Sequence, residues 1–113
     1  MATINVYERY FEAEGVFNGV ERKGVNVLLV SDSEAGHIRY EVAVSFFPHT
    51  SEDDFRISYD AYFSKVVFEG AGRRSRKREE GLLESLRNEA DRLAIDHGAK
   101  IFWDHPLIDE RRG

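Results

Sequence analysis

The stretch VFNGVE, residues 16–21, carries the strongest short-range folding signal of the chain. An Asn-Gly pair favours the two-residue turn of a β-hairpin, because both residues tolerate the positive φ angles that this turn needs. A turn at Asn18 and Gly19 places Phe17 directly opposite Val20. The pair therefore predicts that the chain begins with two antiparallel strands.

The arms of this hairpin are predicted to be long, over residues 4–17 and 20–31. In this register Glu14 falls opposite Lys23, and opposite charges facing each other across two strands support the pairing. Gly15 and Gly24 lie inside the arms and predict bulges or bends there.

Further along the chain, two segments alternate between apolar and polar residues. After a turn predicted at SDSEAGH (31–37), residues 38–46 alternate cleanly, as a strand with one buried face does. The polar loop FPHTSEDD (47–54) is followed by a second alternating segment, residues 55–63. The alternation is then lost, which indicates a bulge or bend near Ser64.

The last third of the chain has the period of a helix. Gly70–Gly72 ends the predicted sheet, and Gly98 is placed as the residue that ends the helix. Six apolar residues share one helical face: Leu82, Leu83, Leu86, Ala90, Leu93 and Ala94. The short apolar run KIFW (100–103) follows as a last strand, and residues 109–113 are predicted to be a frayed tail.

The predicted order is β-β-β-β-α-β. Short turns between successive strands favour an antiparallel meander of four to five strands, with the amphipathic helix packed on one face. We expect residues 1–113 to form a single α+β domain in two layers. One helix covers one face, so the other is left for a second copy of the chain or a protein partner, and a homodimer is the expected assembly.

Composition limits the classes of protein that fit. Hydrophobic residues make up 42% of the chain and charged residues 33%, as expected for a folded soluble protein. The absence of cysteine excludes disulfides, thiol catalysis and thiolate metal sites. No apolar run approaches the length of a membrane helix, and the first ten residues do not resemble a signal peptide. We expect a cytoplasmic protein that has no membrane association and needs no cofactor or metal.

One short segment concentrates positive charge in an acidic chain. Arg73, Arg74, Arg76, Lys77 and Arg78 contribute +5, whereas the net charge of the whole chain is -5. The rest of the chain therefore carries -10, and it repels nucleic acid at long range. The functional interpretation of this segment is a contact with phosphate or with nucleic acid, and the simpler one is a solvated loop or a contact with acidic protein surface.

The start of a helix disfavours cations, because the helix dipole is positive there. We therefore expect the regular helix to begin late, near Glu79, and the basic segment to lie mostly outside it and exposed to solvent.

Catalytic patterns are weak. His97, on the apolar face of the helix, is expected to bond a carbonyl of the last turn rather than to act as a base. Its spacing to His105 fits no recognised metal site. Asp60 is expected to pair with a cross-strand arginine such as Arg39, and the acidic run 52–54 to be a solvated turn. His37 and His49 fall in predicted loops.

The sequence thus favours a non-catalytic binding or assembly protein that works through its sheet face and the basic segment. Two alternatives stay open. One is a nucleic-acid-associated regulator that uses the same five basic residues, and the less favoured one is a small enzyme with an Asp/His site.

Overall fold

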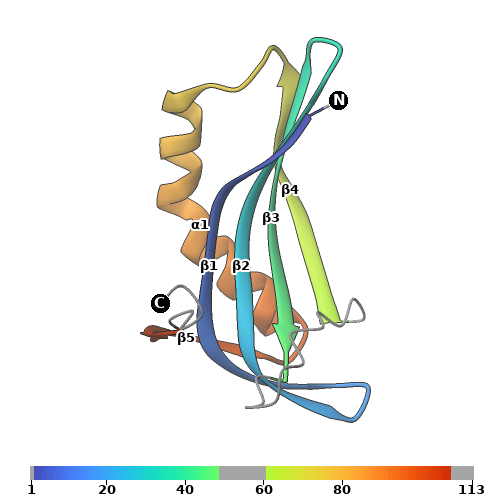
Figure 1. The fold of residues 1–113 in the computed structure, drawn as a ribbon, viewed down its shortest axis with the longest axis vertical. Helices are drawn as coiled ribbons and strands as arrows, with labels where there is room; N and C mark the ends of the chain where they lie inside the picture. Colours follow the sequence, from blue (N-terminus) through green and yellow to red (C-terminus); the bar gives the residue numbers. More distant parts are fainter. Residues whose placement is uncertain (1, 49–60, 108–113) are drawn as a thin grey trace, which may run out of the picture.

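The computed structural model describes residues 2–48 and 61–107, which form one antiparallel sheet with a helix against it (Figure 1). The sheet order is β4-β3-β2-β1-β5. The elements are β1 (Ala2–Phe17), β2 (Val20–Glu34), β3 (His37–Phe47), β4 (Tyr62–Ala71), α1 (Arg76–Asp96) and β5 (Lys100–Pro106). This confirms the predicted α+β class and the order β-β-β-β-α-β. The predicted frayed tail, 109–113, lies outside the described residues.

The first hairpin has the predicted turn. Asn18 and Gly19 have φ angles of 53° and 77°, and Phe17 pairs with Val20. The predicted pairing of Glu14 with Lys23 is wrong, because the register of β1 against β2 shifts between Glu12 and Gly15. In the structure Glu14 pairs instead with Lys100 of β5. The irregularity expected at Gly15 is therefore present, and it moves the acidic residue to the other neighbouring strand.

Gly24 does not form the bulge that was expected there. It pairs regularly with Phe47 on β3, and a Cβ atom at this position would collide with the Phe47 ring. The glycine thus leaves room for the tip of the Phe47 ring next to the backbone of β2.

The second turn is tighter than expected. β2 continues to Glu34, and only Ala35 and Gly36 form the turn, with φ angles of 53° and 79°. Most of the stretch predicted as a turn is therefore strand, and the Ser31 side chain within it is buried. Polar residues at buried strand positions made this segment look like a loop in the sequence.

The fourth strand lies later in the chain than expected. Residues 55–60 of the predicted strand lie outside the described residues, and β4 runs from Tyr62 to Ala71. The segment 64–70, where alternation is lost, is thus strand. The irregularity falls between Val66 and Phe68, opposite Tyr40 and Glu41, and not near Ser64. The extra residue there, Val67, breaks the apolar alternation and explains the misplaced bend.

Helix α1 crosses one face of the sheet, as Figure 1 shows. Its buried apolar residues are Leu86, Ala90, Leu93 and Ala94, and they join the apolar residues of β1 to β3 in one core. Of the predicted stripe, Leu82 packs partly against this core and Leu83 is exposed. Gly98 has a φ of 77°, as a residue that ends a helix often has, so its predicted role is confirmed.

Candidate functional site: the open face of the sheet

The face of the sheet that points away from α1 is the main candidate surface, and we call it the open face. Its side chains alternate with those of the core along each strand. On β1 and β2 the strand registers assign to it Thr3, Asn5, Glu8, Tyr10, Glu12, Gly24, Asn26, Leu28, Val30, Asp32 and Glu34. On β3 and β4 they assign His37, Arg39, Glu41, Ala43, Ser45, Phe47, Tyr62, Ser64, Val66 and Glu69. No described helix or strand packs over these side chains.

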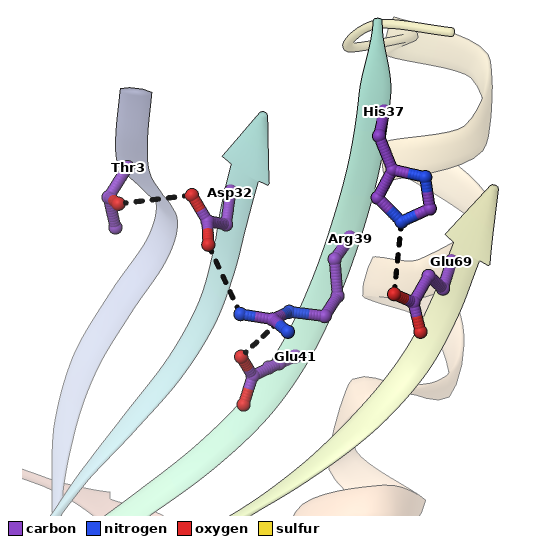
Figure 2. Close-up of polar contacts among 6 residues, drawn as sticks. All are labelled: Thr3, Asp32, His37, Arg39, Glu41 and Glu69. Atoms are coloured by element: carbon purple, nitrogen blue, oxygen red, sulfur yellow. Dashed lines mark hydrogen bonds and ion pairs between the residues drawn. The ribbon is translucent and has the colours of Figure 1, made fainter. Parts of the chain in front are cut away.

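A charged network occupies the end of the open face near the Ala35–Gly36 turn (Figure 2). Arg39 Nη2 donates to Asp32 Oδ2 at 3.1 Å, and Arg39 Nε lies 3.3 Å from Glu41 Oε2. Thr3 Oγ1 donates to the other oxygen of Asp32 at 3.4 Å. One guanidinium thus serves two carboxylates, so the network keeps a net negative charge.

Beside this network, His37 and Glu69 form an exposed pair across β3 and β4 (Figure 2). The ring atom His37 Nε2 lies 2.9 Å from Glu69 Oε2. His37 was expected in a loop, but it is the first residue of β3. Its partner carboxylate adds to the acidic character of this end of the face.

In the middle of the open face, Glu8 is held by neutral donors. The amide groups of Asn5 and Asn26 and the hydroxyl of Tyr10 donate to its carboxylate at 3.2 to 3.4 Å. These bonds use up donors and do not neutralise the charge. The carboxylate therefore stays a centre of negative charge beside an exposed aromatic ring.

Directly next to Glu8, one cross-strand row runs across four strands. Tyr10 of β1 pairs with Asn26 of β2, Asn26 with Ser45 of β3, and Ser45 with Tyr62 of β4. The two tyrosines at the ends are 38% and 41% exposed, whereas Asn26 and Ser45 are 3% and 2% exposed. Partial burial, and secondarily the nearby Glu41 carboxylate, raise the pKa of Tyr62 above its usual value, so its hydroxyl stays protonated at neutral pH.

The part of the open face on β1 to β4 is acidic. The residues assigned to it include six carboxylates and one arginine, Arg39; the carboxylates are Glu8, Glu12, Asp32, Glu34, Glu41 and Glu69. Among these charges lie partly exposed apolar and aromatic side chains, of which Val66 is the most open at 45%. An acidic surface with aromatic rings suits a basic protein partner, because its field attracts cations and its rings offer them flat contacts.

The basic segment lies elsewhere, at the start of α1. Ser75 caps the helix, since its Oγ accepts from Arg78 N at 3.3 Å, and the helix begins at Arg76. The expected late start near Glu79 is therefore wrong, because the last three of the five basic residues lie in the first helical turn. The predicted exposure is confirmed for all five.

Two of the five basic residues have structural partners. Arg74 donates to both oxygens of Glu79 at 2.8 and 3.1 Å, and the Tyr40 hydroxyl donates to Glu79 Oε2 at 2.8 Å. The hydrogen bonds from Arg74 lower the pKa of Glu79, which is 8% exposed, despite its burial. Burial, and then the bond to Glu79, raise the pKa of Tyr40.

The second structural contact is made by Arg78, whose guanidinium stacks over the Phe68 ring at 3.9 Å. These contacts offset the unfavourable placement of cations at a helix start, which is why the helix begins earlier than expected. Arg73, Arg76 and Lys77 form no ion pair with a described residue, so three positive charges face solvent.

Of the histidines considered for catalysis, those that the structure describes are not gathered into one site. His97 donates from Nδ1 to Leu93 O at 2.9 Å, as expected, and its ring stacks on Phe63. His105 lies near Glu12, at 3.6 Å, and no group of three or more metal-ligating residues occurs within 2–48 and 61–107. Asp60, His49 and the acidic run 52–54 lie outside the described residues, and Arg39 pairs with Asp32 and Glu41 instead.

Comparison with known proteins adds no functional information. No family model matches the chain, and no curated protein and no solved structure is significantly similar to it. In the described part of the chain, α1 is too polar to cross a membrane. The open face and the basic segment are therefore the two surfaces from which a function is inferred.

The sequence did not reveal the row Tyr10–Asn26–Ser45–Tyr62. Asn26 and Ser45 occupy the polar positions of alternating strands, where solvent exposure is the ordinary expectation. Their burial depends on the side chains of neighbouring strands, and this requires the register. The one available signal was a polar residue between apolar neighbours in each of two strands, Val25-Asn26-Val27 and Val44-Ser45-Phe46.

Proposed function

We propose that the protein is a non-catalytic binding and assembly protein, whose first partner is a second copy of the same chain. The open face of one copy meets the basic segment of the other. A cytoplasmic location remains part of this proposal.

The observation that carries the proposal is the separation of charge. On β1 to β4 the open face presents six carboxylates against one arginine, whereas Arg73, Arg76 and Lys77 project three cations without a described ion pair. The segment follows the end of β4, at one end of the sheet, and it carries charge of the opposite sign to the face. Surfaces of opposite charge on one molecule favour association with further copies.

Sedimentation equilibrium tests this proposal. At tens of micromolar and about 20 mM salt we expect a mass above 13.0 kDa, and at about 500 mM salt a shift toward monomer, because salt screens contacts between charged surfaces. Replacing Arg73, Arg76 and Lys77 by serine should weaken association. A matched variant that loses three exposed cations elsewhere, Arg9, Lys23 and Arg92, should associate more like the parent.

A 13.0 kDa species under every condition contradicts self-association. The nucleic-acid alternative has its own readout with the same variants. That alternative is favoured if the parent binds RNA or DNA at physiological ionic strength, if the binding weakens with added salt, and if it is lost when Arg73, Arg76 and Lys77 are replaced.

A further inference from the structure

We infer that the row Tyr10–Asn26–Ser45–Tyr62, together with Glu8, is an arginine-binding site that receives a guanidinium from the basic segment of a second copy. This inference rests on the proposed function and names the group that the open face recognises.

The two central residues of the row are polar and buried. Asn26 Oδ1 and Ser45 Oγ have no hydrogen-bond partner among the described residues, although each is shielded from solvent. The two residues are direct cross-strand neighbours on the open face. A buried polar atom without a partner is destabilising, so two of them side by side in the middle of a sheet point to a group that approaches from outside.

The hydrogen-bonding groups that remain unused in the row determine which kind of ligand fits. The Asn26 amide and the Tyr10 hydroxyl already donate to Glu8. What remains is mainly acceptors: Asn26 Oδ1, the two lone pairs of Ser45 Oγ, whose hydroxyl also carries one donor, and the Glu8 carboxylate. A surplus of acceptors with a negative charge selects a cation that carries several donors, and it disfavours phosphate.

The aromatic rings of the row favour a guanidinium over an ammonium group. The exposed rings of Tyr10 and Tyr62 lie at the two ends of the row. A guanidinium is flat, has five donors and stacks on aromatic rings, whereas an ammonium is compact and strongly hydrated. The described part of the chain already contains such contacts, the tightest of which is Arg78 over the Phe68 ring at 3.9 Å. Asn26 Oδ1 and Ser45 Oγ are both shielded from solvent, so a neighbouring side chain has to change its rotamer when the guanidinium enters.

The distance between the row and the basic segment of the same chain shows that the guanidinium has to come from another copy. Tyr62 begins β4, and Arg73 follows shortly after its other end at Ala71. A strand of this length spans roughly 30 Å, which is far beyond the reach of an arginine side chain. The basic segment therefore cannot fill the site of its own chain. The chain leaves β4 toward α1, on the face opposite the row, so the copy that supplies the guanidinium meets the open face with the end of the molecule where α1 begins, in a head-to-tail contact (Figure 1).

The test measures peptide binding to a chain that does not itself associate. The receptor is the variant with Arg73, Arg76 and Lys77 replaced by serine. The probe is a synthetic peptide of residues 70–81, GAGRRSRKREEG, and the comparison peptide has lysine in place of every arginine. Amide chemical shifts give both dissociation constants at about 150 mM salt. We expect the arginine peptide to bind at least about fivefold tighter, with the largest shifts at the row.

Receptor variants locate the site. Tyr62→Ala should weaken binding of the arginine peptide about tenfold, and Ser45→Ala should reduce the preference for arginine over lysine. Val66→Ala, at an exposed position of the same face outside the row, is the control and should bind like the unmodified receptor. Circular dichroism confirms that each variant is folded.

Equal affinity for the two peptides, or equal loss at Tyr62 and Val66, overturns the arginine site. The two proposals fail separately. If the parent dimerises but the peptides bind alike, the proposed function stands and the arginine site is wrong. If the arginine peptide is preferred but the parent stays monomeric, the site stands and self-association is wrong.

Discussion

Asn26 and Ser45 face each other across β2 and β3, and each holds a buried side-chain oxygen without a hydrogen-bond partner in the part of the chain that the structure describes. A strand position at the centre of a sheet is ordinarily filled by an apolar residue or by a polar residue whose groups are all bonded. The pair is therefore costly for the isolated fold. On our proposal, a guanidinium bound at the open face offsets this cost.

Ser45→Ala should stabilise the isolated chain. The change removes a buried hydroxyl that has no partner, so we expect the free energy of unfolding to rise by about 1 kcal/mol. For a domain of this size the melting temperature should then rise by roughly 4–8 °C. Thermal melts of a non-associating background measure this effect, and Ser64→Ala, at an exposed position of β4, is the control. A loss of stability of similar size would show that the Ser45 hydroxyl is well bonded.

The Glu79 contact should make stability depend on acid pH. Its pKa is lowered in the folded chain, chiefly by the hydrogen bonds from Arg74. A group with a lowered folded-state pKa contributes its full stabilisation above the unfolded value, 4.5, and loses it as the pH falls through the folded value. Glu79→Gln should therefore cost about 1–3 kcal/mol at pH 7, and the difference from the parent should shrink in acid.

Urea unfolding from pH 7 down to pH 2 measures this difference. Glu80→Gln is the matched control, because Glu80 is the exposed neighbour of Glu79 on α1. It should change stability by less than about 0.5 kcal/mol at every pH. A constant difference between the parent and Glu79→Gln over the whole range would contradict the assigned ionisation.

Leu86→Ala tests the packing of α1. Leu86 is buried in the core between the helix and the sheet, so its truncation should cost roughly 2–5 kcal/mol. Leu83, on the same predicted stripe but exposed, should cost much less when replaced by alanine. Denaturant melts measure both, and a change at Leu86 below about 0.5 kcal/mol would show that the helix does not pack as described.

Local patterns predicted most of the fold but not the site. The Asn18-Gly19 turn, the alternation of residues 38–46 and the helical stripe each depend on neighbours in the sequence, and each was found. The start of α1 was misplaced, because the pairing of Arg74 with Glu79 and the bond from Tyr40 are tertiary contacts that outweigh the helix dipole. The row through Asn26 and Ser45 needs the register of four strands, which no single stretch contains.

Lys77→Glu should separate the two effects of the basic segment. Lys77 is exposed in the first turn of α1, two residues after the Ser75 cap. An acid there suits the helix dipole, so we expect the chain to gain about 0.3–1 kcal/mol of stability, and less at high salt. The same change puts a negative charge where the acidic open face of a second copy approaches, so self-association at low salt should weaken.

Arg92→Glu, an exposed reversal farther along α1, should give no gain in stability and a smaller effect on association. Denaturant melts and sedimentation of the same samples measure both quantities. A variant that is less stable, or that associates more tightly than the parent, would show that the cations at the helix start do not serve contact with a second copy.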